Sequence, residues 1–104
     1  MQSVFNEQTR DFCRGLLSLR SVEEMEQFLS DAFTVKEIIE ISMRFEVARM
    51  LREGCVYSEI AKKTGASTAT ISRVNRSLQY GEGGYDLAFS RLAQQKDDAE
   101  KEEK

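Results

Sequence analysis

The sequence predicts an all-α fold. Apolar residues recur at spacings of three and four along most of the 104 residues, and no proline interrupts these stretches. The hydrophobic share of 40% and the charged share of 32% are typical of a water-soluble helical protein. Because a chain of this length buries only a modest core, we expect it to gain stability from a dimer.

Two helices are predicted before residue 34. The first spans about Ser3 to Leu19, where apolar residues follow helical spacing. These residues are Val4, Phe5, Phe12, Leu16, Leu17 and Leu19. Ser21 and Glu24 then have the spacing of a capping box, which predicts a second, short helix that ends near Phe33.

A longer third helix follows, and its start repeats the capping-box spacing at Thr34 and Glu37. A stripe of apolar residues marks its buried face: Ile38, Ile41, Phe45, Ala48 and Leu51. Gly54 can adopt the left-handed conformation that ends a helix. The third helix should therefore end just before Gly54.

Residues 57–80 predict a helix-turn-helix. In Tyr57–Gly65, Ile60 and Ala61 face inward, and Gly65 permits a tight turn. Ser67 is a good N-cap for a second helix over 67–80. The inward stripe of that second helix is Ile71, Val74 and Leu78.

The opposite face of this pair suits DNA. Short polar or methyl side chains at the start of a recognition helix reach base edges, arginine pairs with guanine or phosphate, and lysine and hydroxyl groups bind phosphates. The candidate DNA-binding residues are Lys62, Lys63, Ser67, Thr68, Ala69, Thr70, Ser72, Arg73 and Arg76. The net charge is −3, yet between residues 58 and 80 four cations oppose only Glu59. A local basic patch matters more to a polyanion than the total charge.

The rest of the chain predicts one more helix and a tail. The segment Gly81–Gly84 is a flexible connection, and a last helix should span Tyr85 to Gln95. Residues 96–104 are charged, lack apolar groups and are expected to be disordered. We therefore expect a single domain over residues 1–95, followed by this tail.

Composition also excludes several function classes. No apolar run approaches the roughly 20 residues of a membrane span, and residues 1–20 lack the apolar core of a signal peptide, so we expect a cytoplasmic protein. The chain has no histidine, and Cys13 and Cys55 form no C-x-x-C motif, so we expect no metal. No nucleophile lies beside a base and no carboxylates converge, so we predict neither an enzyme nor a cofactor.

Two segments carry a family resemblance. Ala66, Ala69-Thr70-Ile71-Ser72-Arg73 and Ser77-Leu78 resemble the recognition helix of the Trp repressor, and Phe33-Thr34 resembles the start of its long helix. Residues 57–61, 67–74 and 80–85 are similar to the YerC/YecD branch of the Trp-repressor-like family. The resemblance implies six helices, an intertwined two-fold homodimer and a pseudo-palindromic operator on double-stranded DNA. A bacterial transcriptional repressor is thus expected.

The same resemblance implies a site for a small-molecule corepressor. The matching positions are Thr34, Arg44, Arg73 and Ser77. Val74 stands where the Trp repressor has a glycine, and a branched side chain there would crowd an indole ring. Control by tryptophan, control by another small effector and effector-free DNA binding all stay open, as does the alternative of a helical protein-interaction adaptor that does not bind DNA.

Overall fold

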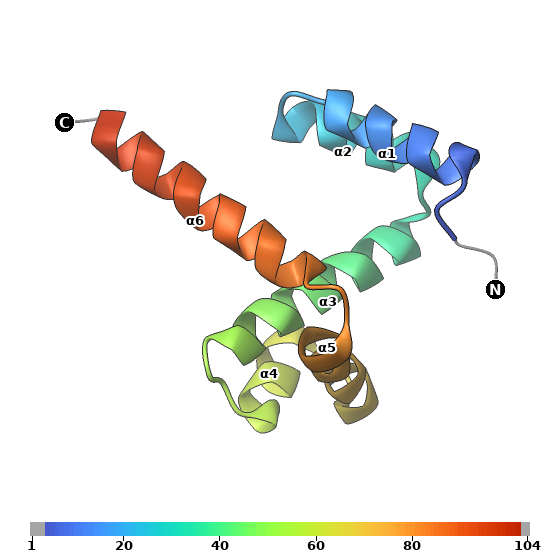
Figure 1. Ribbon diagram of the computed structural model, residues 1–104. Coiled ribbons are helices and arrows are strands. Elements are labelled where there is room, and N and C mark those ends of the chain that lie inside the picture. Colours follow the sequence, from blue (N-terminus) through green and yellow to red (C-terminus); the bar gives the residue numbers. More distant parts are fainter. Residues whose placement is uncertain (1–3, 103–104) are drawn as a thin grey trace. The chain divides into compact units, whose positions relative to one another are not determined.

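The computed structural model describes residues 4–102, which contain six helices and no strand (Figure 1). This confirms the predicted all-α fold. The chain divides into two compact units, one up to Ile38 and one from Ile39. The assignment of residues 1–95 to a single domain stays a prediction.

The first unit contains α1 (Glu7–Ser18) and α2 (Val22–Ala32). The expected start of α1 at Ser3 lies outside the described residues, and Val4 and Phe5 precede the helix. The helix begins later because Asn6 caps it: the Thr9 amide donates to Asn6 Oδ1 at 3.0 Å, and the Asn6 amide donates to Thr9 Oγ1 at 2.8 Å.

Aromatic contacts join the elements of the first unit. The Phe12 ring lies 6.0 Å from the Phe28 ring and 6.3 Å from the Phe33 ring, between centroids. No described residue of α1 or α2 is fully buried, and Leu17 and Val22 are largely exposed. These two helices therefore expose large apolar side chains as well as polar ones.

Helix α3 (Val35–Arg52) begins with the predicted capping box. The Glu37 amide donates to Thr34 Oγ1 at 3.1 Å, and the Thr34 amide donates to the Glu37 carboxylate at 2.9 Å. Gly54, at φ +86°, takes the expected left-handed conformation after the helix. Within the single chain, Ile41 of the predicted buried stripe is 53% exposed, because the core of this unit covers only the second half of α3.

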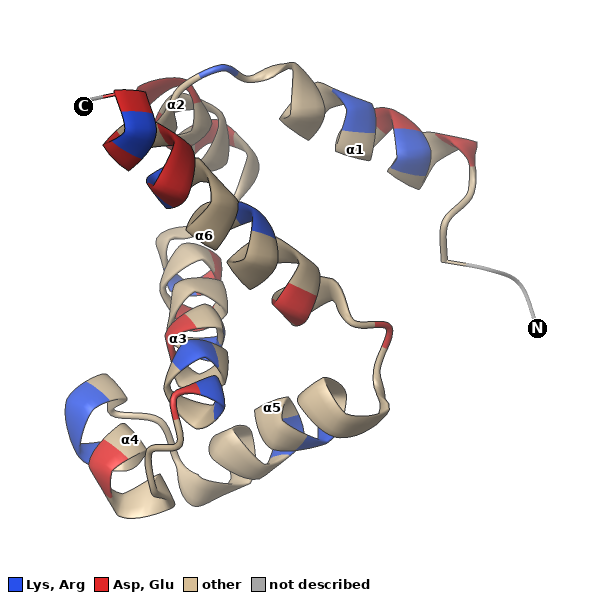
Figure 2. Cartoon of the chain, turned by 60° about the vertical axis from the view of Figure 1, so that its left-hand side comes forward, with Lys and Arg blue, Asp and Glu red and all other residues tan. Residues whose placement is uncertain are grey.

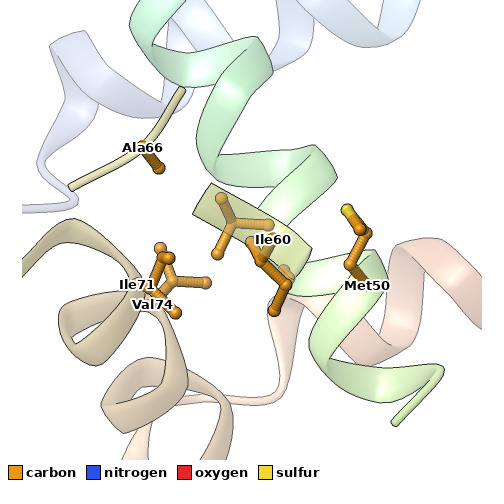
Figure 3. Close-up of a cluster of buried hydrophobic side chains, with 7 residues drawn as sticks. Met50, Ile60, Ala66, Ile71 and Val74 are labelled. Carbon is orange, nitrogen blue, oxygen red and sulfur yellow. The ribbon is translucent and has the colours of Figure 1, made fainter. Parts of the chain in front are cut away.

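The core of the second unit lies among α3, α4 (Tyr57–Thr64) and α5 (Thr68–Tyr80) (Figure 3). Its buried members are Val47, Ala48, Met50, Ile60, Ala66, Ile71 and Val74. Ile60, Ile71 and Val74 were predicted to face inward, and Leu78 packs half-buried at the edge. This apolar cluster fixes α4 and α5 against the end of α3.

Helix α6 (Gly84–Glu102) begins after Gly83, which has φ +77°. Its first turns pack on α3 through Phe45, whose ring lies 5.0 Å from that of Phe89. The tail from Lys96, expected to be disordered, is helical to Glu102, while residues 103 and 104 lie outside the described residues. Its glutamates, lysines and Ala99 are good helix formers, and Gln94 donates to Asp98 one turn later, so these turns need no apolar face. Between residues 4 and 102, no helix is both long and apolar enough to cross a bilayer.

Candidate nucleic-acid interface

The turn between α4 and α5 is fixed by short-range hydrogen bonds. Gly65, at φ +78°, donates its amide to the Ala61 carbonyl at 2.9 Å and so ends α4 in a conformation that favours glycine. Thr64 Oγ1 donates to the Ile60 carbonyl and accepts from the Ala66 amide. The Ser67 hydroxyl accepts from the Thr70 amide at 3.1 Å and so caps α5 as predicted.

One further hydrogen bond joins the two helices. Asn75 Nδ2 of α5 donates to the Tyr57 hydroxyl of α4 at 3.3 Å, alongside the apolar contact of Ile60 and Ile71. Because both polar and apolar contacts join them, α4 and α5 present their outer surfaces as one rigid element.

The candidate DNA-binding residues lie on that outer surface. Thr70 is half-buried and its hydroxyl accepts a hydrogen bond from Ser67, and the other predicted positions are exposed. Figure 2 shows lysine and arginine on both helices, with an acidic residue on α4 and none on α5. Within residues 4–102, Lys62, Arg73 and Arg76 form no ion pair, so their charges are available to an anion.

Lys63 differs from the other cations because a carboxylate of α3 faces it. Its ammonium lies 3.7 Å from Glu46 Oε1, and Glu46 also accepts two hydrogen bonds from Arg49. The bonds from Arg49, and the nearby charges of Arg49 and Lys63, lower the pKa of Glu46, so this carboxylate stays ionised. The α4 surface is therefore less basic than the sequence alone suggests.

A groove of about 300 Å³ lies between α3 and α5. It brings together three of the four predicted effector positions, namely Arg44, Arg73 and Ser77. Thr34 belongs to the first unit and is not among the residues that line the groove. The lining also includes Glu40, Met43, Thr70, Val74 and Tyr85.

Sequence reasoning missed Glu40 and Tyr85 as groove residues. Glu40 lies four residues before Arg44, a spacing that places both on one helix face and could have revealed it. Tyr85 comes from the first turn of α6, whose approach to α5 no local pattern indicates. The groove therefore contains two cations, one carboxylate and one aromatic ring.

A second missed feature is an ion pair between helix ends. Arg52, in the last turn of α3, donates from Nε to Asp86 Oδ1 and from a terminal nitrogen to Asp86 Oδ2, each at 2.8 Å. The same terminal nitrogen donates to the Leu78 carbonyl of α5 at 3.2 Å. The hydrogen bonds from Arg52 lower the pKa of Asp86. No motif could reveal a pair 34 residues apart in the sequence.

The chain is similar in sequence to known proteins. The family described as "Trp repressor protein" matches residues 7–93. The uncharacterized protein YerC of Bacillus subtilis (strain 168) is 51% identical over 78 residues, which are 75% of each chain.

Two crystal structures are also similar. A TrpR-like protein from Eubacterium eligens has a TM-score of 0.83 and 52% identity, with coverage of 85% of this chain and 91% of that one. A proposed Trp repressor from Staphylococcus aureus has a TM-score of 0.84 and 40% identity, with coverage of 86% and 90%.

Proposed function

Because this chain belongs to the Trp repressor protein family, we propose that it is a sequence-specific DNA-binding transcriptional repressor that acts as a homodimer. Proteins of this family are regulators rather than enzymes, in agreement with the sequence-based prediction. The observation that carries the proposal is the exposed outer face of α5, which has no acidic residue and has two arginines without an ion pair to any residue between 4 and 102.

The fold supports a defined docking mode. The start of α5 enters the major groove, where Thr68, Ala69 and Ser72 reach base edges. Arg73 and Arg76, further along the helix, bind guanine or phosphate. Lysines of α4, with Ser67 and Thr70, lie toward the phosphate backbone. Each chain thus reads one half-site.

Exposed apolar residues support the homodimer. Outside the helix-turn-helix, large apolar side chains are exposed on four helices, and apolar surface of this kind is a candidate for contact with a second copy. They include Leu17, Val22, Ile39, Ile41, Leu87 and Leu92. In a two-fold dimer that reads half-sites one helical turn apart in a pseudo-palindrome, the two α5 helices must lie about 34 Å apart.

We further propose that DNA binding needs no tryptophan. The groove offers Arg44 and Arg73 to a carboxylate, but the buried Val74 reduces the space for an indole ring between them. Genomic footprinting of the tagged protein, with and without added tryptophan, tests both the binding to DNA and its independence of tryptophan. The same DNA fragments should be protected in both conditions. Protection only with tryptophan would refute the effector-free mode.

Salt and matched variants test the interface itself. Affinity for a footprinted fragment should fall steeply with salt, because phosphate contacts release counterions. Arg76→Ala should weaken binding to all sequences, whereas Arg10→Ala, which removes the same charge from α1, should leave affinity unchanged. Thr68→Ala should act on sequence preference, by roughly 1 to 3 kcal/mol for a lost base contact.

The competing function is a helical adaptor that binds only proteins. A chain that folds and dimerises normally but binds no genomic fragment at low salt would favour the adaptor. Equal losses for Arg76→Ala and Arg10→Ala would likewise argue against α5 as the DNA-reading helix.

A further inference from the structure

We propose that Arg52 and Asp86 form a clasp that positions α5 for specific DNA recognition. The inference rests on the proposed function, because it assumes that α5 reads DNA. The clasp comprises the two Arg52–Asp86 hydrogen bonds and the bond from Arg52 to the Leu78 carbonyl. Three helix ends meet at this point, and one side chain bonds to both other helices.

The electrostatics of the three helix ends all favour this arrangement. Arg52 lies at the C-terminal ends of α3 and α5, where the helix dipoles favour a cation, and Asp86 lies in the first turn of α6, where a dipole favours an anion. The Leu78 carbonyl belongs to the last turn of α5, whose carbonyls lack helical partners. The guanidinium therefore satisfies a group that the helix itself leaves open.

The connection after α5 cannot set the direction of the helix. Three of the four residues between Tyr80 and Tyr85 are glycines, and Gly83 has φ +77°. Such a segment permits many relative orientations of α5 and α6. A bidentate pair restrains both distance and angle, so the clasp adds to the apolar packing a restraint on the last turn of α5 that the loop does not supply.

The exposure of the Arg52–Asp86 pair distinguishes a role in positioning α5 from a contribution to the stability of the fold. The side chains of Arg52 and Asp86 are 45% and 49% exposed, and ion pairs this open contribute little to the free energy of unfolding. Loss of the clasp should therefore leave the fold intact and release the end of α5. Its effect should appear in recognition rather than in melting temperature.

The decisive variant is Asp86→Asn, because a change in local charge and the loss of the clasp have different effects on the ratio of specific to unrelated DNA affinity. Removal of a negative charge near DNA should by itself strengthen binding. If the clasp positions α5, Asp86→Asn should instead lower the ratio of affinity for a footprinted fragment to affinity for unrelated DNA by about fivefold, as for the loss of one ordinary net hydrogen bond. Partial unfolding would lower both affinities equally and leave this ratio unchanged.

Glu82→Gln is the matched control, since it removes the same charge from the adjacent loop and Glu82 belongs to no ion pair within residues 4–102. It should keep the ratio, and Arg52→Lys, which keeps the charge but loses the bidentate geometry, should lower it. An unchanged ratio in Asp86→Asn would overturn the proposal.

Amide hydrogen exchange tests the clasp in the free protein, in the absence of DNA. Asp86→Asn should speed exchange at residues 79–84 several-fold and leave α4 unchanged. Unchanged exchange at the end of α5 overturns the clasp even if the chain binds no DNA. Faster exchange in a chain that binds no DNA keeps the clasp as a restraint on α5 but removes its proposed role in recognition, and the proposed function fails separately.

Discussion

Val74 offers a direct test of the core because the chain contains a matched control. Val74 is 3% exposed in the middle of α5, whereas Val56 is 56% exposed just before α4. A change to alanine removes the same two methyl groups from each. Any difference between the variants therefore reports the surroundings rather than the atoms removed.

The expected loss in the free energy of unfolding of Val74→Ala is the sum of three contributions. Two fully buried methyl groups contribute about 1.6 kcal/mol. The cavity that they leave lowers the free energy of unfolding by about 1 kcal/mol more, and the better helix propensity of alanine raises it by about 0.5 kcal/mol. The net loss is about 2 kcal/mol, or about 8 to 16 °C in Tm for a domain of this size.

Val56→Ala should cost much less. Under half of that side chain is buried, so the transfer term is about 0.7 kcal/mol and water can fill the space. Urea unfolding of both variants at one fixed protein concentration measures the difference, since the stability of the proposed dimer would depend on concentration. Equal losses in the two variants would refute the packing described for α5.

Four smaller changes test the local reasoning. Ser67→Ala should lower the free energy of unfolding by about 1 kcal/mol through the lost cap, measured by urea titration. Gly65→Ala should cost about 1 to 2 kcal/mol in the same titration, through its positive φ alone, because an added Cβ meets no atom within 4 Å. The hydrogen bond from the Thr34 amide is the main cause of the lowered pKa of Glu37. The contribution of ionised Glu37 to the free energy of unfolding is therefore present above its unfolded pKa and is lost as the pH falls through its folded pKa. Thermal melts of Glu37→Gln should accordingly show a smaller loss of stability below about pH 4.5. Glu46→Gln should strengthen DNA binding in filter assays by releasing Lys63, and a weakened variant would contradict the competition described for α4.

Local sequence signals predicted most of the helix boundaries. The Thr34 capping box, the Ser67 cap and the positive φ values of Gly54 and Gly65 act within a few residues, so the sequence suffices to predict them. The start of α1 was misplaced because Asn6 and Thr9 form a capping box that the apolar pattern does not show.

Long-range features could not be predicted in this way. Ile41 has the periodicity of a buried residue, yet its burial depends on what packs against α3. The clasp of Arg52 and Asp86, and the approach of Glu46 to Lys63, depend on how distant helices meet. The outward face of α5 was predictable because a single helix, with its inward stripe known, determines it.

The groove between α3 and α5 also makes the chain useful for optical spectroscopy. The sequence contains no tryptophan, and its tyrosines occupy different settings: Tyr57 is hydrogen-bonded to Asn75, Tyr80 is 81% exposed, and Tyr85 lines the groove beside Phe45 and Phe89. Any indole emission from a mixture of this protein with tryptophan therefore comes from the added compound alone. An indole held in the groove would accept excitation energy from Tyr85, so quenched tyrosine emission would report occupancy without any label.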